Sequence, residues 1–383
     1  MPHDTAPRGT APHGTAPHDT PGRAPLVDPE LALRTARFVA PFPRHDPARA
    51  AALTRAVHAE LPTIDAAARA FTGLGADLPP TSIRVVGRSA WVRTNVEVIA
   101  ASFEPLRERL EQRPAASRRV LGLQLGGLLG LLSTKVLGQF VLPLAGAGSG
   151  QLLLVGPNVL ALAEEHGDLA DDIRRTVVLH EVTHRLQFDG SGGWLGDHLR
   201  DLVARYLEHT RVDAHHLAEL APKLPAAIAK AKETGDLKPL LETVLTPEQA
   251  EVMDEAQGLM SLLEGHGNAT MYSATGAGIE DPEGVREALA NRQGDIASKV
   301  LTAVAGLEMK RRQYRDGEVF VRAVLEQAGT DGLNRAFGKA DNLPRGDEIA
   351  DPDGWLARVV QAGEVAEVPE SPEAPEDGED QAP

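Results

Sequence analysis

The spacing of hydrophobic and polar positions along the chain predicts a body made mainly of helices. Apolar residues recur at helical intervals over 46–60, 92–112 and 120–138. By contrast, the segment Gln151-Leu152-Leu153-Leu154-Val155 is typical of a short buried strand, ended by a turn at Gly156-Pro157-Asn158. We therefore expect a mainly α fold, of the α+β type, with a small sheet beside the helices.

Three further helices are predicted from the residues at their ends. The first begins at the aspartate pair Asp171-Asp172, whose charges suit a helix N-terminus, and runs through Phe188 to the Gly-Ser-Gly-Gly run at 190–193. The second covers about 195–209. The third opens with Thr246-Pro247-Glu248-Gln249, in which the threonine is the N-cap and the glutamine closes a capping box.

One domain flanked by two tails is the organisation that we expect. Residues 1–26 contain a degenerate Thr-Ala-Pro repeat with histidines, and residues 362–383 are acidic and rich in proline. Segments of this composition cannot bury a core, so we expect both tails to be disordered. Between them, residues 27–361 show no repeat of the length that solenoids have, and they are assigned to a single domain.

Charge and cysteine content narrow the classes of partner and site. The formal net charge of -16 argues against a nucleic-acid partner, because phosphate binding needs a basic surface. Cysteine is absent, so any zinc must be held by histidines and carboxylates. The first 24 residues lack the basic start and apolar stretch of a secretory signal, and together with the missing cysteines this favours the cytoplasm.

The most apolar stretch of the chain does not indicate a membrane protein. It runs from Val120 to Thr134 and is about fifteen residues long, whereas a spanning helix needs roughly twenty. Gln124 and several glycines also interrupt it. We expect a buried helical hairpin at this position.

The candidate chemistry lies at His180-Glu181-Val182-Thr183-His184, within the first of these three helices. Residues four apart share a helix face, so His180 and His184 can direct two imidazoles at one metal ion. Ile173, Val177 and Phe188 share that stripe, where an unpaired polar group would be costly. Glu181 lies beside the histidines and could take a proton from water as the general base. The composition predicts only about 0.03 such matches by chance.

A catalytic zinc needs a third protein ligand as well as an open position for water. The chain lacks the extended histidine motif of the metzincins, since Gln187 and Gly190 stand where that motif has glycine and histidine. A carboxylate or a distant histidine remains. Glu264 is the preferred candidate, because it follows a run of apolar positions that must be buried, and a buried carboxylate needs a partner. The alternative for Glu264 is an exposed residue near a helix end.

The residues beside Glu264 offer two further candidates. Asn268 faces the same way as Glu264 on a helix and could hydrogen-bond a ligand. His266 lies about 200° round the helix, so it could reach the site only if the flanking glycines break the helix; it is then a candidate catalytic residue that donates to an oxyanion. Other conspicuous residues are interpreted without a role in the site. His215-His216 are expected at the surface, Gly276-Ala277-Gly278 in a loop, and Tyr272 and Tyr314 as packing residues.

These residues and several other segments resemble a known family, the actinobacterial zincin-like proteins classed as candidate zinc-dependent metalloproteases or hydrolases and often labelled coenzyme F-420 biosynthesis-associated. The resemblance covers about 85–360 and rests on Trp91-Val92-Arg93-Thr94-Asn95, Val136-Leu137-Gly138-Gln139-Phe140, Val155-Gly156-Pro157-Asn158, 180–188, Trp194-Leu195, 263–267, 310–317, Asn342-Leu343-Pro344 and Trp355. It implies a zincin-like helical body.

For the site, the resemblance implies zinc held by His180, His184 and Glu264, with Glu181 as the catalytic base. The family often has an acidic residue where this chain has Asn268. The resemblance supplies no substrate.

Two functions of different classes follow from these residues. The first is a zinc-dependent hydrolase, a metallopeptidase or amide hydrolase acting on a peptide or small amide. The second is a non-catalytic interaction protein with a structural or vestigial zinc site. Glu181 favours the enzyme, because a purely structural site has no use for a base beside its ligands.

Overall fold

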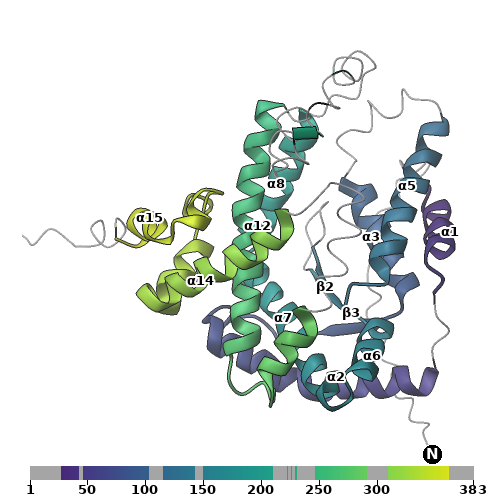
Figure 1. The fold of residues 1–383 in the computed structure, drawn as a ribbon, viewed down its shortest axis with the longest axis horizontal. Helices are drawn as coiled ribbons and strands as arrows, with labels where there is room; N and C mark the ends of the chain where they lie inside the picture. Colours follow the sequence, from purple (N-terminus) through teal and green to yellow (C-terminus); the bar gives the residue numbers. More distant parts are fainter. Residues whose placement is uncertain are drawn as a thin grey trace, which may run out of the picture.

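The computed structural model describes residues 27–42, 46–102, 115–142, 150–209, 246–290 and 309–361, together with 222, 226, 229 and 230. Within these residues helices surround one small sheet (Figure 1). The helices are α1 (Pro29–Val39), α2 (Pro47–Thr72), α3 (Arg88–Ser102), α5 (Ala115–Ser133), α6 (Gly156–Glu165), α7 (Ala170–Gly190), α8 (Trp194–Glu208), α12 (Pro247–Ser273), α14 (Met309–Asn334) and α15 (Pro352–Leu356). The expected mainly α fold with a small sheet is confirmed.

The sheet has three strands in the order β1-β3-β2: β1 (Ile83–Val86), β3 (Gln151–Val155) and β2 (Gly138–Val141). β1 is parallel to β3 and β2 is antiparallel to it. The predicted strand 151–155 is thus correct, and its central place explains why four of its five residues are buried. The predicted turn after it is wrong, because α6 begins directly at Gly156 with a proline in its first turn.

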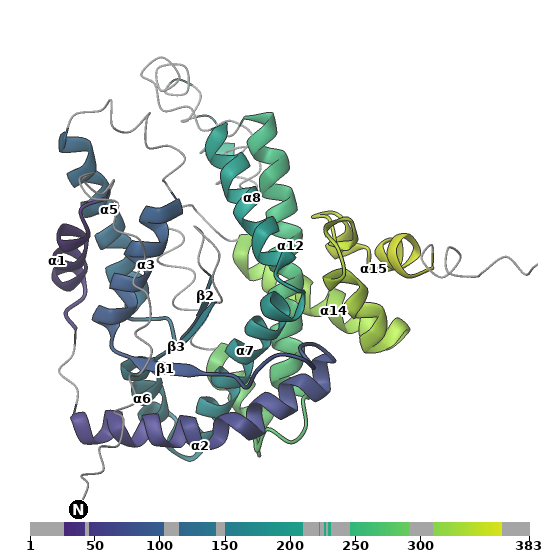
Figure 2. The same cartoon turned by 180° about the vertical axis from the view of Figure 1, so that it is seen from behind.

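Alternate residues of β3 face two separate parts of the core. Leu152 and Leu154 pack with apolar residues of α2, α7, α12 and α14. Leu153 and Val155 pack with those of α1, α3 and α5. The sheet consequently stands between two groups of helices, as the view from behind shows (Figure 2). This alternation follows from the two-residue period of a strand.

The predicted hairpin over Val120–Thr134 is wrong, because residues 120–133 belong to the single helix α5. Gly126 and Gly130 lie directly against the backbone of α1, where a side chain would not fit. The helix is only partly covered, and Leu123 and Leu131 remain exposed at 47% and 39%. Among the helices that the structure describes, none is both long and apolar enough to cross a membrane.

Helix starts and ends agree with the predictions where local signals mark them. Thr246 caps α12, and both hydrogen bonds of the predicted capping box form. α7 and α8 match the predicted ranges within one or two residues. By contrast, α2 continues to Thr72, well beyond the predicted end at residue 60. Several predictions fall outside the described residues: those on both tails, on residues 103–112 of the predicted helix 92–112, on His215-His216 and on the side chain of Tyr314.

Candidate metal centre

α7 brings two histidine side chains together at the centre of the molecule. It is buried along most of its length between α2, α6, α12 and the sheet. His180 and His184 lie one turn apart on it, with their Nε2 atoms 3.0 Å apart and their rings edge to face. The two nitrogens are therefore directed at one point, as the four-residue spacing predicts.

α12 supplies a third donor from a distant part of the sequence. Oε2 of Glu264 lies 3.5 Å from Nε2 of His180, and one donor atom each from His180, His184 and Glu264 lie within 4.8 Å of one another. Gly267, one turn further along α12, permits this approach. A Cβ at Gly267 would lie 2.7 Å from Cε1 of His180, so only glycine leaves room for the imidazole.

The spacing of these donors fits a zinc ion. Zinc–nitrogen bonds of about 2.0–2.1 Å at tetrahedral angles place two nitrogen ligands about 3.3 Å apart. The observed distances of 3.0 Å between the two imidazoles and 3.5 Å from imidazole to carboxylate bracket that value. Two imidazoles and one carboxylate are also a donor set that catalytic zinc sites use. Glu264, which the sequence analysis prefers as the third ligand, thus lies beside both histidines, with its side chain 20% exposed.

Glu181 points from the same helix toward the edge strand β2. Its side chain packs on Gly138, where a Cβ would lie 2.5 Å from Cγ of Glu181. Burial raises the pKa of Glu181 to about 7, although His184 and a hydrogen bond donated by the Phe140 amide oppose this rise. A dication held by the cluster would also lower this pKa, because positive charge favours the carboxylate.

One oxygen of Glu181 has a property that suits a base. Oε2 is buried and has no hydrogen-bond partner among the described residues. A buried acceptor without a partner is costly, and a water molecule is the simplest group that would satisfy it.

The condition under which His266 would reach the site, a break in its helix, is not met. α12 is one continuous helix from Pro247 to Ser273, so the glycines do not break it. Gly265 instead lets the backbone of α14 approach, at Gly317. The His266 ring is 1% exposed, packs against Phe337 and lies 3.3 Å from Nε2 of Gln187. Burial lowers the pKa of His266 to about 3, which keeps the ring neutral.

Two residues beside the second histidine acquire roles that the sequence did not reveal. Gln187 is fully buried, and its Oε1 lies 2.8 Å from Nδ1 of His184. The only available signal was its place three residues after His184, on a neighbouring part of the helix surface. Arg185 donates to the carbonyl of Pro79 and pairs with Asp189. Arg185 therefore supports the packing of α7.

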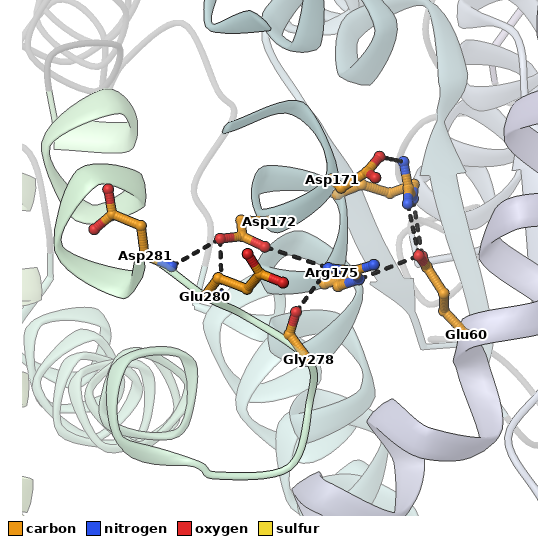
Figure 3. Close-up of polar contacts among 8 residues, drawn as sticks. Glu60, Asp171, Asp172, Arg175, Gly278, Glu280 and Asp281 are labelled. Atoms are coloured by element: carbon orange, nitrogen blue, oxygen red, sulfur yellow. Dashed lines mark hydrogen bonds and ion pairs between the residues drawn. The ribbon is translucent and has the colours of Figure 1, made fainter. Parts of the chain in front are cut away.

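α7 is fixed to α2 by a group of ion pairs two turns before the histidines (Figure 3). Glu60 of α2 accepts two hydrogen bonds from Arg174, at 2.6 and 2.9 Å. Its Oε1 also accepts one from Nε of Arg175, at 3.1 Å. These three side chains are at most 23% exposed, so solvent screens the pairs only in part.

The same group holds the loop that follows α12. Arg175 donates to the carbonyl of Gly278, and Oδ2 of Asp172 accepts the backbone amides of Glu280 and Asp281 at 2.9 and 2.8 Å (Figure 3). Gly278 has φ +73°, which a residue with a side chain rarely adopts. These contacts therefore connect α7, which carries the two histidines, to the loop that follows α12, which carries Glu264.

Comparisons with known proteins agree with this geometry. Residues 27–356 match a family model described as zincin-like metallopeptidase. A crystal structure from Chloroflexus aurantiacus, described as a candidate hydrolase with a novel fold, aligns with 28% identity and a TM-score of 0.63. The alignment covers 87% of this chain and 98% of that one. No curated protein sequence matches the chain. Neither match bears on an actinobacterial origin or on coenzyme F-420, which stay predictions.

Proposed function

The chain belongs to the zincin-like metallopeptidase family, and from this premise we propose that it is a zinc-dependent hydrolase of peptide or small amide bonds. In this proposal His180, His184 and Glu264 hold the zinc, and Glu181 is the general base. The hydrolase-type relative from Chloroflexus aurantiacus supports the reaction class.

One observation carries the proposal: three metal-binding donors converge beside a buried carboxylate that is not one of them. A structural zinc site is almost always closed by four protein ligands, whereas this cluster has three donors and Glu181 is not one of them. A hydrolytic site needs both the donors and such a carboxylate, because water must lose a proton as it attacks a carbonyl. The unpartnered oxygen of Glu181 is the atom that would accept that proton.

The chain's own residues divide the chemistry between them. Zinc bound by the three donors would supply the positive charge that polarises the scissile carbonyl and makes water more acidic. Glu181 takes the proton at Oε2 and then passes it to the leaving nitrogen. The Phe140 amide donates to the Glu181 carboxylate and holds it in place. Burial raises the pKa of Glu181 and a bound dication would lower it, so the two effects oppose each other at the proposed base.

Cleavage of a peptide library, followed by mass spectrometry, tests this proposal. The zinc-loaded protein should cleave members of the library, and the chelated protein should not. Glu181→Gln should keep the zinc and the fold while turnover falls on the order of 100- to 10,000-fold. Glu326→Gln, which alters an exposed carboxylate on α14, is the matched control and should keep full turnover.

Two results would contradict the proposal. Wild-type turnover by Glu181→Gln would remove Glu181 from the mechanism. The second result has two parts: no member of a broad library of peptides and small amides is cleaved, and a partner protein binds the wild type and Glu181→Gln equally. The chain would then be a non-catalytic interaction protein and not an enzyme.

A further inference from the structure

We infer that Gln187 is a positioning residue that fixes the tautomer of His184 and ties α7 to the segment of α12 beside Glu264. The inference rests on the proposed metal centre and does not depend on the reaction that the centre performs. It is carried by a set of hydrogen bonds in the core, which no part of the family match assigns.

Gln187 uses both ends of its amide between the two helices. Its Oε1 lies 2.8 Å from Nδ1 of His184. Its Nε2 donates to the backbone carbonyl of Leu263 at 3.0 Å and lies 3.3 Å from Nδ1 of His266. Gln187 is 0% exposed, so water cannot replace these contacts.

The carbonyl of Leu263 determines which way the amide faces. A backbone carbonyl can only accept, so the group that contacts it must be the NH₂ of Gln187. The reversed amide would place two oxygens against each other in the protein core, without a proton between them. The oxygen of Gln187 is therefore the atom that faces His184.

The direction of the amide then sets the protons of both histidines that contact it. An amide oxygen can only accept, so Nδ1 of His184 carries the proton and donates to Oε1. Nε2 of His184 consequently keeps its lone pair, and this is the atom that faces His180 and the cluster. On the other side the NH₂ of Gln187 donates to Nδ1 of His266.

His266 thereby has a structural role in place of the catalytic one predicted from the sequence. Its Nδ1 accepts a hydrogen bond from the second N–H of the Gln187 amide, so both N–H groups of that amide have an acceptor. The ring is also fixed by its contact with Phe337. His266 contacts Gln187, and Gln187 in turn contacts His184.

The bridge has a mechanical effect as well as an electronic one. Leu263 is the residue before Glu264, so the amide of Gln187 links the helix of the two histidines to the turn that carries the third donor. A partner that orients a ligand histidine typically contributes about 10- to 100-fold to metal affinity. Loss of Gln187 should have an effect of that size.

Two measurements on the intact protein test the inference without any substrate. Zinc affinity is measured by competition with a chelator, and the His184 tautomer by long-range ¹H–¹⁵N spectra of the zinc-free protein. Gln187→Leu should weaken zinc binding by about 10- to 100-fold and shift His184 toward the Nε2–H form. Gln187→Glu keeps an acceptor for His184 and faces Leu263 with a carboxylate, so it should keep the tautomer while the protein loses stability.

Thr270→Val is the matched control, because it removes a buried hydroxyl that bonds within α12, to the carbonyl of His266. It should lower stability and leave zinc affinity and the tautomer unchanged. An unchanged tautomer and a zinc affinity within about twofold of wild type in Gln187→Leu would overturn the inference. A wild-type protein that binds zinc without hydrolysing anything would contradict the proposed function alone. If the wild type bound no zinc, the tautomer would still decide the inference.

Discussion

Replacement of Gly267 by alanine is expected to weaken zinc binding, because the new methyl group would occupy the space of a ligand. An ideal Cβ at this position lies 2.7 Å from Cε1 and 2.9 Å from Nδ1 of His180, and 3.5 Å from Cε1 of His184. Ordinary contacts begin near 3.4 Å, so the His180 ring or α12 must move by about 0.7 Å. Metal–ligand distances tolerate only about 0.2 Å.

The expected loss follows from the energy of that displacement. Overpacking of a filled core costs about 1–3 kcal/mol. If this cost falls on the zinc-bound state, zinc affinity should decrease by roughly 5- to 150-fold. Alanine also favours a helix over glycine by up to about 1 kcal/mol, so the stability of the zinc-free protein should change less than its affinity for zinc. The two quantities thus separate a local effect at the site from general destabilisation.

Gly127→Ala is the matched control for this experiment. Gly127 also lies within a helix, α5, and an added Cβ there would meet no atom within 4 Å. The control should keep the wild-type zinc affinity and show an equal or higher melting temperature. Chelator competition gives the affinities and thermal unfolding gives the stabilities. Wild-type zinc affinity in Gly267→Ala would refute the idea that close packing on α12 positions His180.

Three further predictions concern other parts of the molecule. Gly138→Ala would place a Cβ 2.5 Å from Cγ of Glu181, so it should keep the zinc and lower kcat on any substrate found; an unchanged kcat would contradict the role of β2 in holding the base. Glu60→Gln should lower the free energy of unfolding by about 1–3 kcal/mol in denaturant titrations and leave zinc affinity unchanged, because its charged hydrogen bonds join α2 to the start of α7; a loss of zinc instead would place this group within the site. Burial raises the pKa of Tyr272 from 10.0 to about 12, so the stability that this phenol contributes is complete below pH 10 and is lost as pH rises toward 12. Tyr272→Phe keeps a ring against Arg286 and should remove this loss of stability at alkaline pH, which is on the order of 2–3 kcal/mol. If the free energy of unfolding fell equally in the two proteins between pH 10 and 12, Tyr272 would not be the cause.

The elements that could be predicted from the sequence are those with strong local signals. α7 has acidic residues at its start and glycines after its end, and α12 has a capping box. The spacing of His180 and His184 then sets their shared face, because helix geometry is nearly invariant. The expectation for Glu264 rests on the need of a buried carboxylate for a partner, and the structure leaves this side chain 20% exposed beside His180.

The parts that the sequence did not predict depend on contacts between distant segments. β2 lies at 138–141, so it begins at the last residue of the segment 120–138 predicted as a helix, and it becomes a strand by pairing with β3. Its chain segment has no alternation strong enough to show this alone. The hydrogen bond from the Phe140 amide to Glu181 depends on that pairing, so it was invisible as well.

The glycines around His266 show the same limit in another form. Locally, Gly265 and Gly267 suggest a helix break, because glycine is a weak helix former. In the fold they remain helical, and each one makes room for a neighbour: Gly317 of α14 in one case and His180 in the other. A glycine needed for close approach and a glycine that ends a helix look alike until the neighbours are placed.

The central claim is that His180, His184 and Glu264 hold one zinc ion, and anomalous diffraction from zinc-loaded crystals on the two sides of the zinc absorption edge tests it most directly. The account predicts one anomalous peak per chain, about 2.0–2.2 Å from Nε2 of both histidines and from a carboxylate oxygen of Glu264, with Glu181 not bound to it. A peak bound to other residues, or no peak in a crystal whose solution contains zinc in excess, would contradict the account.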